Sequence, residues 1–255
     1  MNIFALHNDP IIAAVSQHDR HVVKMTLETA QLLSTAVWTN QDIRALWEST
    51  FGPLPLDGKA SGGYNNMGVR LYRPTHINHP CALWVHDTLP NFAWTVLHLN
   101  GLIGEYHRRF QKVHGCEIVR RGFNKMLAKH VGVDRFHTRN ESRLIMIDPA
   151  IRALANQHIP FAQCMPDEYK HHDSVTAYRT LYLEDKIFQD HVKWTRCDSL
   201  PDLLFEQVTS QRSLNRLAQL VKAHTEDRVV KPNPPLTHPD LLKPSNPKAL
   251  TRFGK

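Results

Sequence analysis

Hydrophobic residues recur at helical spacing along most of the chain, and alternating strand patterns are nearly absent. Apolar side chains spaced at three and four residues are typical of amphipathic helices. The first such segment runs from about Pro10 to Trp38, with a break expected near Ser16–Asp19. We expect five further helices. One begins at Pro80, and the others span Leu89–His114, 115–143 (broken by Gly122 and Gly132), Asp173–Gln189 and Leu203–His224. The predicted fold class is all-α, a compact helical domain.

Local signals support these limits and suggest a domain division. Proline is tolerated at the first helical position, as at Pro80, and Asp173 is a typical N-cap residue. A Gly-rich passage, Phe51–Val69, is expected to form a surface loop or insertion. Residues 231–255 hold six of the sixteen prolines and five basic residues against the single acid Asp240. Such a segment is expected to be an extended, largely disordered basic tail, so we divide the chain into one domain, 1–230, and a tail, 231–255.

Charge and cysteine usage narrow the class of protein. Lys plus Arg outnumber Asp plus Glu by 31 to 24, and this excess favours a polyanionic partner such as nucleic acid. No window of about 18 uninterrupted apolar residues occurs, and Met1–Asp9 lacks the pattern of a secretory signal, so no membrane partner is expected. The four cysteines are scattered without a Cys-x-x-Cys pair, which is typical of reduced thiols in a cytosolic protein. They are Cys81, Cys116, Cys164 and Cys197.

The first predicted helix carries a narrow polar stripe. His21, Lys24, Glu28 and Gln31 lie within about 80° of arc at 100° per residue, and much of the remaining surface is apolar or small. An ordinary surface helix has the inverse pattern. The stripe therefore suggests an internal cleft, where burial can shift pKa values and prepare acid–base chemistry. The alternative is a solvated stripe stabilised by the Lys24–Glu28 ion pair.

Further polar residues gather at helix starts and along helix faces. Asn78 and His79 precede a helix start, where free backbone N–H groups suit either a phosphate or simple capping. Asn91, His98 and Glu105 recur at seven-residue spacing and therefore share one helical face, with Arg108 one turn beyond Glu105. This face suits either a site or a satisfied core network. Together with the first helix and the region around 161–186, these clusters supply the candidate substrate-binding residues. They are Gln31, Asn78, His79, Asn91, Glu105, Arg108, Tyr169 and Lys186.

Positive charge is concentrated between Arg108 and Arg143, where ten basic residues face three acids. Arg121, Lys125 and Lys129 are four residues apart and project from one helical face. Such a face suits the phosphates of duplex DNA, which supply most non-specific affinity, although a merely solvated face is the alternative. The predicted DNA-backbone contacts are Arg109, Lys112, Arg120, Arg121, Lys125 and Lys129.

Several common site motifs are missing from the chain. There is no His-Glu-x-x-His or Cys-x-x-Cys motif, although 17 histidines are present. Phosphate-binding glycine loops and a serine nucleophile elbow are equally absent. The sequence alone therefore predicts neither a metal nor an organic cofactor.

One combination of motifs resembles a family of tailed-phage proteins and covers most of residues 1–196. The motifs are His21-Val-Val-Lys24-Met-x-x-Glu28-x-Ala-Gln31-Leu-Leu, Asn78-His79-Pro80-Cys81-x-x-Trp84, Glu105-Tyr106, Phe161-Ala-x-Cys164-Met-Pro166, Ala177-Tyr178-Arg179 and Trp194. A more distant similarity links Asp19-x-His21, Glu28, His79, Glu105 and Arg109 to the phage pyrimidine-dimer DNA glycosylase called endonuclease V.

The resemblance to endonuclease V implies an all-α enzyme that flips a nucleotide out of damaged duplex DNA. In that family the N-terminal amine attacks the sugar C1′ to form a Schiff base, and a glutamate on the first long helix assists. Glu28 occupies the position of that glutamate, and His21 and His79 match polar residues near its site. The family's N-terminal threonine is replaced, since Asn2 follows Met1, and its flanking arginines are replaced by Leu27 and Gln31.

These departures leave room for another amine and for other reactions. Lys24, one turn from Glu28 in a desolvated cleft, is the alternative nucleophile; activity retained on mutation to Met would contradict this. The first hypothesis is a phage DNA glycosylase, with AP-lyase activity, that acts in DNA repair or on a modified pyrimidine in the host cytoplasm. The second is a DNA-modifying transferase that attaches an amino acid or amine to activated 5-hydroxymethyluracil, with Lys24, His21 and Arg108 binding the phosphate leaving group. The third is a non-enzymatic DNA-binding factor.

Overall fold

The computed structural model describes residues 1–54, 69–133 and 148–230, and no strand occurs within these ranges. The predicted all-α class is confirmed for this part of the chain. None of its helices is long and apolar enough to cross a lipid bilayer. The helices are α1 Pro10–Val15, α2 Asp19–Thr39, α3 Gln41–Phe51, α4 Pro80–Asp87, α5 Leu89–Phe110, α6 Glu117–His130, α8 Pro149–Ala155, η1 Asp167–Tyr169, α9 Ser174–Glu184, η2 Lys186–Phe188, α10 Leu203–Glu206 and α11 Gln211–Val230.

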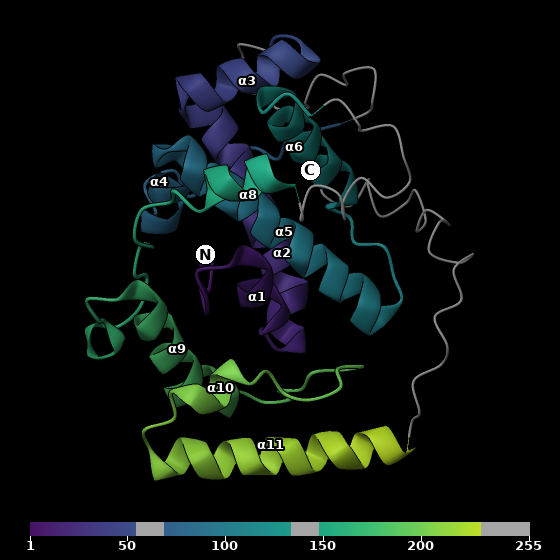
Figure 1. Cartoon of the computed structure of the whole chain (residues 1–255), viewed down its shortest axis with the longest axis vertical. Helices are drawn as coiled ribbons and strands as arrows, with labels where there is room; N and C mark the ends of the chain where they lie inside the picture. Colours follow the sequence, from purple (N-terminus) through teal and green to yellow (C-terminus); the bar gives the residue numbers. More distant parts are fainter. Residues whose placement is uncertain (55–68, 134–147, 231–255) are drawn as a thin grey trace.

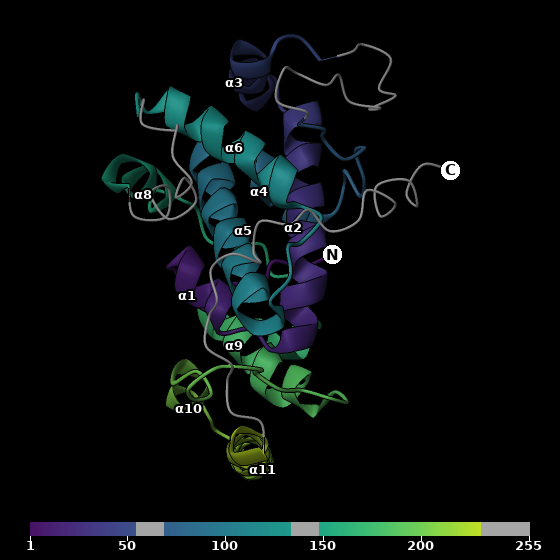
Figure 2. The ribbon, with the colours of Figure 1, turned by 90° about the vertical axis from the view of Figure 1, so that its right-hand side faces the viewer.

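Helix α5 is the centre of the structure. It packs against α1, α2, α4, α6 and α8, and the two ribbon views show it running through the middle of the bundle (Figures 1 and 2). Every residue from Asn91 to Ile103 is buried, because this stretch carries apolar or small side chains on nearly all sides. Helices α3 and α6 lie at one end of the molecule, and α9, α10 and α11 lie at the other (Figure 1).

The crossing of α1 over α5 depends on a glycine. A Cβ atom added at Gly101 would lie 2.7 Å from the Cβ of Ala14, well inside van der Waals contact. The absent side chain therefore lets the two helices approach closely. The same crossing fixes the turn at Ser16–His18 between α1 and α2, at the break that the sequence predicted.

The N-terminal segment is part of the core. Ile3, Phe4 and Leu6 are almost fully buried. The ring of Phe4 stacks on His21 of α2 at 4.2 Å, and the carbonyl of Leu6 accepts a hydrogen bond from Arg179 Nε of α9 at 2.8 Å. These contacts hold the first residues of the chain between α2 and α9.

Helix starts follow the sequence signals. The side chains of Asp9, Asn40, His79 and Asp173 each accept a backbone N–H of the helix that follows. The predicted start at Pro80 and the predicted cap at Asp173 are both confirmed. These local bonds satisfy N–H groups that have no partner within the helix.

Several predicted limits are wrong. Helix α6 continues through Gly122, and the absent side chain lets α6 lie against Val69 and Trp47, since an added Cβ would come within 2.6 and 3.0 Å of them. Of the two glycines, Gly132, with φ of 74°, lies directly after Val131, the residue that caps the end of α6. The helix predicted over Asp173–Gln189 ends at Glu184 and is followed by η2. The helix predicted over Leu203–His224 is divided into α10 and α11.

The sequence predicted no helix over the residues of α3 or α8. Most of the Gly-rich passage, residues 55–68, and the tail 231–255 lie outside the described residues.

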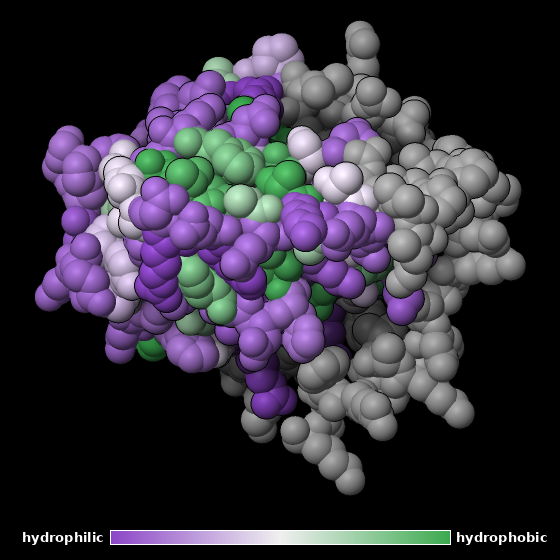
Figure 3. All heavy atoms as spheres, turned by 90° about the horizontal axis from the view of Figure 1, so that it is seen from below, coloured by the Kyte–Doolittle hydropathy of each residue, from purple (hydrophilic) through white to green (hydrophobic). Residues whose placement is uncertain are grey.

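Figure 3 views the molecule from the α11 side, where hydrophilic residues surround separate hydrophobic areas. Helices α10 and α11 contribute the exposed apolar side chains Phe205, Leu214 and Val221.

Candidate active site

The polar stripe of α2 divides into buried and exposed parts. His21 is buried, Glu28 and Gln31 are half-buried, and Lys24 is exposed. The side chain of Lys24 is 70% exposed and that of Glu28 is 16% exposed, and the two form an ion pair with Lys24 Nζ 3.4 Å from Glu28 Oε1. The prediction of a desolvated lysine is therefore wrong: the long side chain extends into solvent, while the shorter glutamate stays close to the helix.

His21 lies in a stack of rings. Its imidazole is between Phe4, at 4.2 Å, and His18, at 4.0 Å. Burial, reinforced by the nearby charges of His18 and Lys186, lowers the pKa of His21 to about 2. The ring is therefore neutral near pH 7 and is a poor proton acceptor, which argues against the predicted acid–base role. Its position instead shapes one wall of the site.

A pocket of about 880 Å³ opens beside this stripe. Its walls come from the N-terminal segment, from α2, from the end of α5, and from η2 with the residues that follow. Four cationic side chains, Arg20, Lys24, Lys186 and Lys193, line it together with the acids Asp19, Glu28 and Asp190. The volume lies within the range of pockets that hold drug-sized ligands, so a nucleotide is an acceptable occupant by size.

The chain terminus belongs to this pocket. Met1 and Asn2 line it, and the Asn2 amide donates a hydrogen bond to the carbonyl of Cys164 at 3.0 Å. Burial lowers the pKa of His79, and the positive charge of the N-terminal amine lowers it further, whereas the Glu28 carboxylate opposes this change. The amine, Glu28 and His79 are therefore electrostatic neighbours, although they are distant in sequence.

Other predicted binding residues are scattered. Lys186 lines the pocket, whereas Asn78 is exposed, and Tyr169 is half-buried in η1. Asn91 is fully buried between α4 and α8: its amide donates to the Trp84 carbonyl at 2.7 Å, and its oxygen accepts the N–H of Ile159 at 3.1 Å. Asn91 therefore holds the core together and cannot reach a ligand in the pocket.

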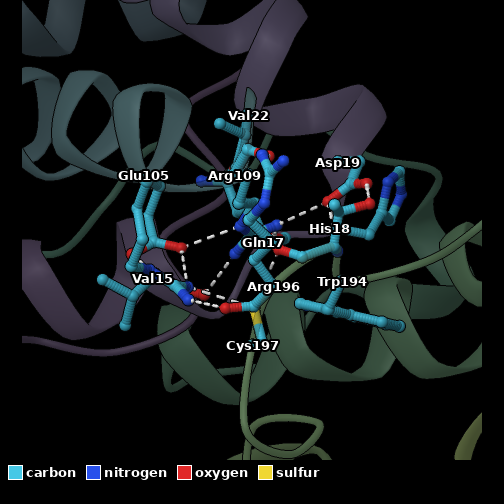
Figure 4. Close-up of polar contacts among 12 residues, drawn as sticks. Val15, Gln17, His18, Asp19, Val22, Glu105, Arg109, Trp194, Arg196 and Cys197 are labelled. Carbon is cyan, nitrogen blue, oxygen red and sulfur yellow. Dashed lines mark hydrogen bonds and ion pairs between the residues drawn. The ribbon is translucent and has the colours of Figure 1, made fainter. Parts of the chain in front are cut away.

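Glu105 and Arg109 form a buried network (Figure 4) that Arg108, whose side chain is 38% exposed, joins from the surface, and none of the three lines the pocket. Arg109 has no exposed surface and donates to Glu105 Oε2 at 2.8 Å, to Asp19 Oδ1 at 3.1 Å, and to the carbonyls of Val15 and Gln17. Arg108 also bonds to Glu105 and reaches the carbonyl of Arg196. Glu105 and Arg108 therefore bind other groups of the protein, and neither lines the pocket.

The predicted DNA-backbone contacts also divide by burial. Arg109 and Arg120 are buried, and Arg120 donates to Glu117 and to Asn100 Oδ1 at 2.6 Å, so neither arginine can contact a phosphate. The others remain at or near the surface, because they lie on the outer face of α6 or just after α5. They are Lys112, Arg121, Lys125 and Lys129.

Sequence reasoning missed several residues of the site. Arg20, Lys193 and Asp190 line the pocket, and nothing in their local spacing singles them out. Cys81 and Cys164, predicted to be scattered thiols, have their Sγ atoms 3.0 Å apart; both are free cysteines. Only the packing of the 161–166 segment on α4 brings them together.

No protein-family model, curated protein or solved structure matches the chain. The resemblance to endonuclease V therefore stays a prediction, and the function must be argued from the pocket itself.

Proposed function

We propose that this chain is a phage DNA-processing enzyme that flips a pyrimidine nucleotide into the pocket and acts as a DNA glycosylase with AP-lyase activity. Its substrate is a damaged or modified pyrimidine in duplex DNA, and it works in the cytoplasm of an infected bacterium. One observation carries the proposal: the two residues whose amines are candidate nucleophiles, Met1 and Lys24, line the same nucleotide-sized pocket as Glu28.

The N-terminal amine is the better nucleophile of the two. Met1 is half-buried at the pocket wall, whereas the Lys24 side chain extends mostly into solvent. Glu28 is within reach of the same space and can take up and return protons.

The proposed reaction proceeds through an imine. The amine nitrogen bonds to C1′, the bond from C1′ to the base breaks, and the pyrimidine leaves with the bonding electron pair. Glu28 accepts a proton from the nitrogen and then returns it to the ring oxygen, so the sugar opens to a Schiff base. Surface cations hold the flanking phosphates, chiefly from the outer face of α6.

Borohydride trapping tests this reaction. Borohydride reduces a Schiff base to a stable amine, so the protein should become covalently attached to duplexes carrying a thymine dimer or an abasic site. The adduct should fall by about 10²–10⁴-fold in Glu28→Gln and persist in Glu226→Gln, which removes an exposed acid on α11. Peptide mapping should place the sugar on Met1, and absence of any adduct on all substrates would contradict the proposal.

A second candidate reaction uses the same pocket. Its four cationic side chains suit a phosphate leaving group on an activated 5-hydroxymethyluracil, which an amino acid or amine would displace with Glu28 as base. This reaction forms no imine between protein and DNA. Transfer of a radiolabelled amine to 5-substituted DNA, without a borohydride adduct, would favour it over the glycosylase.

A further inference from the structure

Three side chains that can each donate a ligand atom to a metal ion, one imidazole and two thiols, lie together at the start of α4. A ring nitrogen of His79, Sγ of Cys81 and Sγ of Cys164 all lie within 4.8 Å of one another. Cys81 is buried, and His79 and Cys164 are half-buried. Two of these residues are separated by one position, while Cys164 comes from a segment 83 residues later, so only the tertiary structure assembles the set.

The other two cysteines have different partners. Cys116 Sγ is 3.2 Å from the hydroxyl of Tyr72, and Cys197 Sγ accepts a hydrogen bond from Arg108 at 3.0 Å. In the described parts of the chain, His79, Cys81 and Cys164 form the single group of this kind. The cluster is therefore a specific juxtaposition and does not follow from a general abundance of thiols.

We propose that His79, Cys81 and Cys164 bind one Zn²⁺ ion as its three protein ligands, which leaves its fourth coordination position for water or a substrate. Two thiolates and an imidazole are donors that zinc prefers, and three protein ligands with an open position are typical of catalytic zinc sites. The sequence alone predicted no metal, because the motif it would need is divided between distant segments.

The geometry suits zinc after a small adjustment. With Zn–S bonds of about 2.3 Å in a tetrahedron, two sulfur ligands lie about 3.8 Å apart, so the present 3.0 Å separation must open by less than 1 Å. Cys164 is half-buried in the segment between α8 and η1, which is irregular in structure, and this segment can accommodate such a movement.

The protonation of the ligands differs between the two thiols, because the hydrogen bond to Cys164 and burial raise the pKa of Cys81 well above its usual value. A hydrogen bond donated by Cys81 lowers the pKa of Cys164, and the N-terminal charge and Lys170 act in the same direction. Burial lowers the pKa of His79, so its ring is neutral near pH 7, as a metal ligand must be. Binding of Zn²⁺ would release the remaining thiol protons, and two thiolates would balance the charge of the ion.

Metal titration of the full-length protein tests the site. The reduced protein, stripped with a chelator, is titrated with Co²⁺ alone and then with Zn²⁺. We expect one equivalent of Co²⁺ to produce a thiolate-to-cobalt charge-transfer band in the near ultraviolet, and Zn²⁺ to displace it. The band should be lost in Cys164→Ser and His79→Gln and retained in Cys197→Ser, with circular dichroism to verify that each variant is folded.

Three results of the metal titration would overturn the proposal. They are a failure of the folded, reduced protein to bind one equivalent, a band that survives in folded Cys164→Ser, and a band that is lost in folded Cys197→Ser. Closure of a Cys81–Cys164 disulfide in air, without Zn²⁺ binding after reduction, would likewise overturn it and identify a redox pair. Because no DNA is present, these outcomes are independent of the glycosylase test.

Discussion

Arg109 Nη1 lies 3.1 Å from Asp19 Oδ1, and both side chains are almost completely buried. This ion pair connects the end of α5 to the first residue of α2, and Asp19 also accepts bonds from the backbone and hydroxyl of Thr195. Three segments are therefore held by one carboxylate. Because the pair is buried, removal of one partner leaves the other as an uncompensated charge.

Arg109→Met should therefore destabilise the protein by about 3–5 kcal/mol, as measured by urea unfolding. The matched control is Arg121→Met, whose side chain is 55% exposed and pairs with Glu117 at the surface. That change should cost less than about 1 kcal/mol. Equal losses in the two variants would contradict the buried role of Arg109.

Three buried histidines predict acid sensitivity. Burial lowers the pKa of His18 and His98 to about 3 and that of His21 to about 2. Histidine in an unfolded chain titrates near 6.5, so below that pH the unfolded state binds more protons than the folded state. The stabilisation is complete above about pH 6.5 and decreases as pH falls toward the folded-state pKa values, by up to about 1.4 kcal/mol per pH unit for each ring.

Urea unfolding measured from pH 7 to pH 5 should reveal this slope. His98→Gln removes one ring and should make the dependence of stability on pH shallower, whatever its effect at pH 7. His172→Gln changes an exposed histidine and should leave the slope as it is. A slope that is unchanged in His98→Gln would show that His98 does not contribute.

Two glycines of α5 should respond in opposite ways to alanine. Gly101→Ala places a Cβ 2.7 Å from Ala14 and should destabilise by about 1–3 kcal/mol, because α1 must move. Gly104 has no atom within 4 Å of the added Cβ, so Gly104→Ala should stabilise by about 0.5–1 kcal/mol through helix propensity. Thermal unfolding distinguishes the two, and a loss of stability in both would contradict the packing argument.

The outer face of α6 should determine the salt dependence of DNA binding. Arg121→Gln and Lys129→Gln should each weaken binding to duplexes of any sequence and reduce the slope of log K against log salt by about 1. The control is Lys222→Gln, an exposed change on α11 that should leave the slope unaltered. Fluorescence anisotropy across a salt series measures this, and an equal reduction in the control would indicate only a general charge effect.

The local pattern of the sequence was sufficient for the longest helices and for two of the helix starts. Pro80 and Asp173 begin helices where predicted, and the break between α1 and α2 falls at Ser16–His18. These features depend on residues three or four positions apart, so the local sequence contains the information that determines them. The same reasoning was wrong at Gly122, where it predicted a break in the helix. This glycine packs within α6 against Trp47 and Val69, which are remote in sequence.

Burial and convergence were decided only by the tertiary structure. Arg120 and Arg121 are adjacent in sequence, yet one is buried and the other exposed, because α6 turns only one of them toward α5. The stripe of α2 predicted Glu28 as a site residue, but the packing of the first residues between α2 and α9 placed Met1 in the same pocket. Spacing along a helix reports which residues share a face. Which faces meet, and which distant segments such as Cys81 and Cys164 lie together, depends on the packing of the whole chain.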